Sequence, residues 1–158
     1  MTAKELNELF ASKNQTFGSV ESFTGGLFAR EITRVPGASR VFKGALVTYA
    51  TQEKERILGI NKSLIKRVGV VSQEVAGEMA SHGMCLMDVD YCVSFTGNAG
   101  PDAMEGKPVG EVYIGVCCKD IIQVFKYQLS GSREDIQNQA VELGYQHLAI
   151  MLREHSSN

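Results

Sequence analysis

Hydrophobic residues along the chain follow two different spacings, and these predict where helices and strands lie. Apolar side chains three or four positions apart indicate an amphipathic helix, whereas short apolar runs bounded by glycine, proline or polar residues indicate a strand. The helical pattern occurs at residues 3–13, 25–34, 51–58, 62–67, 73–87 and 133–153. The strand pattern occurs at residues 16–21, 41–50, 91–95, 111–117 and 121–128.

Residues that suit helix caps stand at several of these boundaries. Thr51, Asn61 and Ser72 carry side chains that can accept a hydrogen bond from the first turn of the following helix. Ser132 is followed three positions later by Asp135, which resembles a capping box. We therefore expect these residues to fix the starts of the last four helices.

The order of the elements predicts the fold class. Strands that alternate with helices, followed by two consecutive strands, predict an α/β fold with a mixed, mostly parallel sheet covered by helices on both faces. The short link Lys119-Asp120 makes the last two strands one antiparallel hairpin. Val75, Met79 and Leu86 are expected to form the inward face of their helix.

The length of the chain predicts the number of domains, and two segments are expected to be mobile or frayed. We expect a single domain over residues 1–158, long enough for a hydrophobic core. The segment through Gly106 and Lys107-Pro108 is predicted to be mobile, and residues 155–158 are predicted to be frayed.

Charge and hydropathy exclude several kinds of partner. The formal net charge is −2 and the isoelectric point is near 5.9, which gives no electrostatic reason to expect nucleic-acid binding. The sequence has no apolar run of membrane-spanning length, and its acidic, amphipathic beginning has no signal-peptide core. We therefore expect a cytoplasmic protein that binds neither membranes nor nucleic acid.

The cysteines and histidines indicate neither a disulfide framework nor a metal site. The 4 cysteines lack C-x-x-C spacing, and two of them, Cys117 and Cys118, are adjacent, so we expect reduced thiols. The 3 histidines are scattered, without the i, i+4 pairing typical of zinc ligands. The sequence thus predicts no metal.

The segment Ser19 to Gly26 has the strongest potential for chemistry. It predicts a strand, a tight turn and a helix start, with hydroxyl groups and two glycines in the turn. Such a junction directs free backbone N–H groups at a ligand and exposes Ser22 and Thr24, where a nucleophile would be useful. The simpler alternative is that these hydroxyls only cap the helix.

Two other turns are expected to lie beside this one. Ligands of open α/β sheets bind at the carboxyl ends of parallel strands. Residues 22–26, residues 96–101 and the region around Tyr49 each follow a predicted strand. Their convergence favours an active site over helix capping.

A series of motifs runs in order along about residues 5 to 153. They are Glu21-Ser22-Phe23-Thr24-Gly25-Gly26, Val35-Pro36-Gly37-Ala38-Ser39, Phe42, Gly44, Val47-Thr48-Tyr49, Lys54, Leu58-Gly59-Ile60, Val71-Ser72-Gln73-Glu74-Val75-Ala76, Thr96-Gly97, Ala99-Gly100-Pro101-Asp102 and Lys107-Pro108-Val109-Gly110. With these motifs the chain resembles the CinA C-terminal domain family, whose enzymatic members are nicotinamide-nucleotide amidases. Larger family proteins carry an additional N-terminal domain, and this chain resembles the stand-alone form.

The resemblance implies a three-layer α/β/α sandwich and an amidohydrolase without cofactor or metal. The expected reaction converts nicotinamide mononucleotide into nicotinate mononucleotide and ammonia. The resemblance implies that Ser22 is the nucleophile and Lys54 its base. It also implies that Tyr49 passes a proton or supports the lysine. Without the resemblance, Lys54 belongs to a charged run, residues 51–56, typical of a solvated helix face, where replacement would leave the fold intact.

Further residues are expected to bind the substrate. Backbone N–H groups near Thr24, Gly25 and Gly26 are expected to stabilise an oxyanion. Arg133 is implied by the resemblance as a contact for a substrate anion. The second turn contributes the expected ligand cradle Thr96, Gly97, Asn98 and Gly100, although its glycines also suit a turn without a ligand.

Several departures from the family pattern leave the substrate open. Phe23 replaces a usual cysteine, Asn98 an aliphatic residue, Ser132 an acidic residue and Gln137 a second arginine, and residues 103–105 replace a glycine-rich stretch. A catalytically inactive nucleotide- or anion-binding regulatory protein is one alternative, and an amidase for another small amide is a second. We also expect a homo-oligomer, taken as a dimer, with strands 111–117 and 121–128 as its contact.

Overall fold

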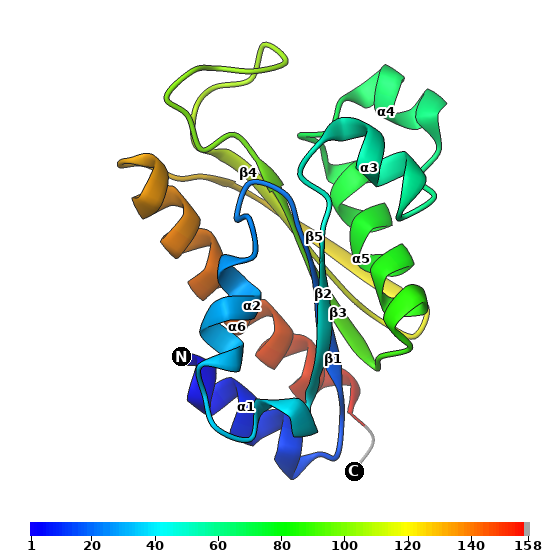
Figure 1. The fold of residues 1–158 in the computed structure, drawn as a ribbon, viewed down its shortest axis with the longest axis vertical. Coiled ribbons are helices and arrows are strands. Elements are labelled where there is room, and N and C mark those ends of the chain that lie inside the picture. The colour runs from blue at the N-terminus through cyan, green and yellow to red at the C-terminus, as the bar shows by residue number, and fades with distance from the viewer. Residues whose placement is uncertain (157–158) are drawn as a thin grey trace.

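A five-stranded sheet separates two layers of helices (Figure 1). The computed structural model describes residues 1–156. The strands are β1 Phe17–Glu21, β2 Phe42–Val47, β3 Tyr91–Gly97, β4 Glu111–Cys118 and β5 Ile121–Gln128. The helices are α1 Ala3–Ser12, α2 Leu27–Thr33, α3 Thr51–Arg56, α4 Lys62–Val68, α5 Gln73–Met87 and α6 Arg133–His155, with the 3₁₀ turn η1 Ala38–Arg40.

The strand order β2-β1-β3-β4-β5 gives the sheet a parallel and an antiparallel part. β1 pairs in parallel with β2 and β3, whereas β3–β4 and β4–β5 are antiparallel, so β4 alone runs against the other strands. The predicted α/β fold with a mixed sheet is confirmed. Of the two strands expected at a dimer contact, β4 is buried throughout inside the sheet, whereas β5 lies at an edge.

The two helical layers bury two different cores. Helices α1, α2 and α6 cover one face over an aromatic core that includes Phe17, Phe28 and Phe95. The other face, covered by α5 with α4 beside it, holds a smaller core that includes Val20 and Met79. Successive strand residues point to opposite faces, so β1 supplies both cores.

Most of the predicted helix caps are confirmed. Asn61 caps α4, Ser72 caps α5, and Ser132 and Asp135 form a capping box at α6. The prediction for Thr51 is wrong, because this residue is already the first of α3 and the start of that helix has no side-chain cap.

The inward face predicted for α5 is partly wrong. Val75 and Met79 are buried, but Leu86 is 57% exposed. The buried stripe continues through Gly83 to Met87, which packs against the smaller core. At the other end of the chain, His155 is the last residue of α6, and residues 157–158, part of the predicted frayed tail, lie outside the described residues.

The β3–β4 connection, predicted to be mobile, is anchored to the connection between α4 and α5. The Glu105 carboxylate accepts hydrogen bonds from the backbone N–H groups of Val70 and Val71 at 3.0 and 3.2 Å. The Lys107 ammonium donates to the carbonyl oxygens of Val68, the last residue of α4, and of Val71 in the connection. Gly69 has a φ of 80°, and a Cβ there would overlap the Glu105 carboxylate. These anchors join residues about 35 positions apart, so local patterns do not reveal them.

Candidate active site

The side chains of Ser22 and Lys54 meet at the carboxyl ends of β1 and β2. The Lys54 Nζ lies 3.0 Å from the Ser22 Oγ and 2.7 Å from the carbonyl oxygen of Thr48. Ser22 directly follows β1, Thr48 directly follows β2, and Lys54 lies on α3. Because β1 and β2 are neighbouring parallel strands, the segments that follow them emerge side by side.

Lys54 is buried rather than solvated. Its exposed fraction is 1%, so the interpretation of residues 51–56 as a wholly solvated helix face is wrong at this position. Burial lowers the pKa of Lys54 from 10.5 to about 8, and the negative charge of Glu105 opposes this shift. Lys54 forms no salt bridge with any residue from 1 to 156. About a tenth of the amine is then neutral at pH 7 and about half at pH 8, and only a neutral amine can take a proton.

Glu21 organises the turn that carries Ser22. The sequence predicted no role for this residue beyond its place in a motif. Its carboxylate is fully buried and accepts hydrogen bonds from the hydroxyls of Ser19 and Thr24 and from the N–H groups of Phe28 and Ala29, at 2.8 to 3.3 Å. Glu21 therefore satisfies the start of α2, and the alternative in which Ser22 and Thr24 cap this helix is wrong. No local pattern signalled this role, because an acid usually caps from the position just before its helix.

The three predicted turns converge on a cavity of about 150 Å³. Besides Ser22 and Lys54, its walls include five other predicted site residues, namely Tyr49, Thr96, Gly97, Asn98 and Arg133. Thr24, Gly25 and Gly26 instead line a neighbouring open groove of about 720 Å³. Arg133 borders both spaces, so it separates the cavity from the groove.

The backbone after Ser22 offers donors that differ partly from those expected. The N–H of Gly25 donates to the Ser22 carbonyl at 3.0 Å, so Gly25 does not supply the expected oxyanion donor. The N–H groups of Phe23 and Thr24 have no hydrogen-bond partner among residues 1–156. These two directly follow Ser22, and the N–H of Gly26 likewise has no partner among the described residues, so Phe23, Thr24 and Gly26 are the available donors of the turn. The Thr24 hydroxyl donates a hydrogen bond to the Glu21 carboxylate at 2.8 Å.

The second turn is held mainly by its own hydrogen bonds. The Asn98 Oδ1 accepts from the N–H of Gly100 at 3.0 Å, and the Thr96 hydroxyl donates to the Val70 carbonyl at 2.7 Å. A Cβ on Gly97 would overlap Val112, so this glycine is needed for packing. The turn shapes the cavity wall, and its side-chain hydrogen-bonding groups are already engaged.

Tyr49 and Arg133 bridge the mouth of the cavity. Arg133 donates to the Tyr49 hydroxyl at 3.0 Å and to the Gly100 carbonyl at 2.7 Å. Tyr49 is 61% exposed, so it is not packed within the sheet. Gln137, one turn farther along α6, donates to the Phe23 carbonyl at 2.7 Å. The departures at residues 23 and 137 therefore lie at the site.

The sequence of this chain was compared with models of protein families and with known proteins. The family model described as CinA C-terminal domain matches residues 1–152. The chain belongs to the CinA C-terminal domain family. Two relatives, whose names refer to competence-damage induction, come from Bacillus pumilus and Listeria monocytogenes. They are 39% identical over 151 residues and 42% identical over 142 residues, which is 96% and 89% of this chain. These matches cover 36% and 34% of the relatives, so the chain spans about a third of their length.

Solved structures of CinA proteins share the fold. A CinA superfamily protein from Klebsiella pneumoniae superposes with a TM-score of 0.92 at 21% identity, over 98% of this chain and 99% of that one. At that identity the likeness shows the fold alone. The competence/damage inducible protein CihA from Agrobacterium tumefaciens gives a TM-score of 0.90 at 26% identity, over 94% of this chain and 92% of that one.

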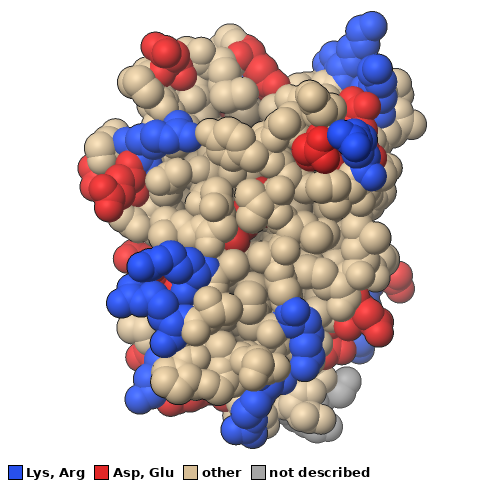
Figure 2. Space-filling view, in the orientation of Figure 1, with Lys and Arg blue, Asp and Glu red and all other residues tan. Residues whose placement is uncertain are grey.

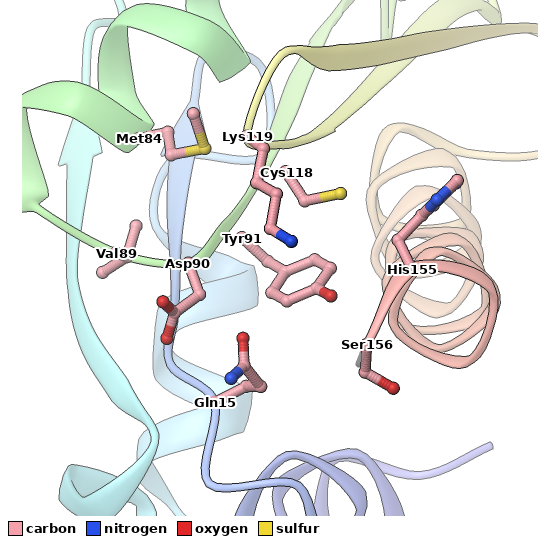
Figure 3. Close-up of a pocket in the computed structure, with 9 residues that line it drawn as sticks. All are labelled: Gln15, Met84, Val89, Asp90, Tyr91, Cys118, Lys119, His155 and Ser156. Carbon is pink, nitrogen blue, oxygen red and sulfur yellow. The ribbon is translucent and has the colours of Figure 1, made fainter. Parts of the chain in front are cut away.

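Size and charge do not by themselves mark the site of this CinA domain. A cavity of about 330 Å³ beside Tyr91, Lys119 and His155 contains none of the predicted site residues (Figure 3). On the face in Figure 2, basic and acidic groups are interspersed around a mostly uncharged centre. Within residues 1–156, no three His, Cys, Asp or Glu side chains gather as metal ligands, and no helix is long and apolar enough to cross a membrane.

Removing the Glu21 carboxylate is expected to destabilise the fold strongly. In Glu21→Ala, four donors, three of them buried, lose their acceptor, so the free energy of unfolding should fall by about 2–4 kcal/mol in urea titrations. Glu8→Ala, which removes an exposed acid from α1, should change it by less than about 0.5 kcal/mol. Similar losses in both variants would contradict the role assigned to Glu21.

Burial of Lys54 predicts a specific pH dependence of stability. Between pH 8 and 10.5 the unfolded chain keeps the lysine proton that the folded chain has lost, so this residue's contribution to stability rises with pH over that interval. Relative to Lys54→Met, the wild type should gain about 2 kcal/mol of unfolding free energy from pH 7 to 9.5. Methionine fills similar space without a charge, so the variant should fold. Parallel pH profiles for the two proteins would show that Lys54 is solvated.

Proposed function

We propose that this CinA domain is an amidohydrolase that converts nicotinamide mononucleotide into nicotinate mononucleotide and ammonia. The observation that carries the proposal is the buried Lys54 amine, 3.0 Å from the Ser22 hydroxyl at the wall of a cavity. Membership of the CinA C-terminal domain family supports the choice of substrate.

The proposed reaction begins with attack of the Ser22 Oγ on the amide carbon. Lys54, when neutral, takes the hydroxyl proton as the new oxygen–carbon bond forms, and the carbonyl electron pair moves to its oxygen. The free N–H groups of Phe23 and Thr24 are the donors for that oxyanion, and one such donor contributes about 3 kcal/mol. Lys54 then returns the proton to the leaving nitrogen, ammonia departs, and water hydrolyses the acyl-enzyme.

The cavity supports a substrate whose amide is carried on a small ring. A space of about 150 Å³ holds a ring carboxamide but is too small for a whole nucleotide. The sugar and phosphate would therefore extend past Arg133 into the groove of about 720 Å³. Arg30, which is paired with Glu31 at 2.7 Å, and Arg133 border this groove together with Glu134. The two guanidinium groups are the candidate contacts for a phosphate there.

An ammonia-release assay tests this proposal. Purified protein incubated with nicotinamide mononucleotide should release ammonia and nicotinate mononucleotide, with a rate that rises with pH through about 8 as Lys54 loses its proton. Ser22→Ala and Lys54→Met should each lose at least about 1,000-fold in kcat while remaining folded. Lys62→Met, an exposed lysine on α4, is the matched control and should retain wild-type turnover. Wild-type turnover no faster than that of Ser22→Ala would refute the proposal for this substrate.

A regulatory nucleotide-binding protein without catalysis is the second candidate. It is favoured by Gln137, whose amide is engaged with the Phe23 carbonyl where the family pattern has a second arginine. Calorimetry distinguishes the two: tight binding of the nucleotide without ammonia release supports the regulatory function. Ammonia release from another small amide, with the same dependence on Ser22 and Lys54, would support an amidase of different specificity.

A further inference from the structure

The Lys54 amine has one donor more than the structure supplies acceptors for. A protonated lysine carries three N–H groups. In this site the Nζ has two acceptors among residues 1–156, the Thr48 carbonyl oxygen at 2.7 Å and the Ser22 Oγ at 3.0 Å. With an exposed fraction of 1%, Lys54 has little access to water for a third. A buried charged donor without a partner is unfavourable, so the ammonium formed on proton transfer requires another acceptor.

An acceptor without a partner lies on the residue that already holds this amine. Thr48 is fully buried, and its Oγ1 has no hydrogen-bond partner among the described residues. Its backbone is fixed on both sides, because its N–H donates to the Glu21 carbonyl at 2.9 Å and its carbonyl accepts from Lys54. An unsatisfied buried hydroxyl costs stability, and an isosteric valine at this strand end would avoid that cost. Packing therefore does not explain a threonine here.

We propose that the Thr48 hydroxyl accepts the third hydrogen bond of the Lys54 ammonium, which makes Thr48 a positioning residue for the proposed base. Rotation about χ1 moves the Oγ1 around a backbone whose carbonyl is already 2.7 Å from the Nζ. When the Ser22 O–H bond breaks and the new N–H bond forms, two donors of Lys54 then face the Thr48 carbonyl and the Thr48 hydroxyl. The third donor is the new N–H, which faces the Ser22 oxygen and later passes its proton to the leaving nitrogen. The catalytic meaning of this contact rests on the proposed function, but the contact itself does not.

The charged surroundings of Lys54 come from several elements. Glu105 on the β3–β4 connection acts on its charge, and Arg133 of α6 and Tyr49 line the same cavity. On α3 itself, Glu53 is paired with Arg56, and Glu55 follows Lys54 directly. Thr48 is neutral, so its effect on Lys54 requires a hydrogen bond to the charged form and cannot be a general electrostatic one.

The test compares Thr48→Val, which removes the hydroxyl at constant size, with Thr48→Ser, which keeps it. The ¹³Cε resonance of Lys54, assigned with Lys54→Met, reports protonation of the amine without any substrate. Reaction of Ser22 with a small alkyl fluorophosphonate reports nucleophilicity: an oxygen–phosphorus bond forms, fluoride leaves with its electron pair, and Lys54 takes the proton. Thermal unfolding of each variant reports stability.

We expect the titration midpoint of Lys54 in Thr48→Val to lie about 0.5 pH unit below the midpoint in the wild type, because loss of an acceptor disfavours the charged amine. Its maximal rate of phosphonylation should fall at least about tenfold, while its melting temperature stays equal or rises. Thr48→Ser should restore the wild-type midpoint and rate. Thr33→Val, on the outer end of α2, should match the wild type in all three measurements.

Wild-type titration and phosphonylation in Thr48→Val would overturn the proposal. So would equal loss of melting temperature and rate in Thr48→Val and Thr48→Ser, because that pattern indicates a role in packing. If Thr48→Val shifts the Lys54 titration but the wild type neither reacts at Ser22 nor releases ammonia, the hydrogen bond is supported and the proposed function is refuted.

Discussion

The site depends on burial of one amine against one hydroxyl. In water, Lys54 would be almost wholly protonated at neutral pH and would only donate hydrogen bonds. Removal from solvent penalises its charge, and no salt bridge within residues 1–156 compensates for that penalty. The amine, of which about half is then neutral at pH 8, lies 3.0 Å from Ser22. A lysine becomes a plausible base here because the surrounding fold withholds both water and a full counter-charge.

The fold meets this condition by joining separate segments at one end of the sheet. The parallel strands β2, β1 and β3 end together, so the turns that follow them form the cavity. α3 follows the turn after β2 and carries Lys54 inward. The β3–β4 connection forms another wall. Its residues Glu105 and Lys107 hydrogen-bond to backbone groups at the end of α4 and in the segment before α5. Each wall is thus anchored to an element distant in the sequence.

Local patterns predicted the elements well and the site only in part. Periodicity and caps such as Asn61 and Ser72 depend on neighbouring residues, and these predictions are confirmed. Burial of Lys54 depends on how α3 packs, and its charged neighbours gave the opposite impression. The family resemblance, rather than any pattern of spacing, selected Lys54. The role of Glu21 was missed because its carboxylate reaches forward seven and eight residues to the start of α2.

The alternation of β1 has a consequence for how this part of the chain can vary. Glu21 directs its carboxylate toward α2 on one face, and Ser22, the next residue, directs its hydroxyl toward Lys54 on the other. A single inserted or deleted residue between Phe17 and Ser22 would exchange these directions, presenting the acid to the amine and the hydroxyl to the aromatic core. The number of residues in this strand is therefore fixed by two groups, the Glu21 carboxylate that faces α2 and the Ser22 hydroxyl that faces Lys54.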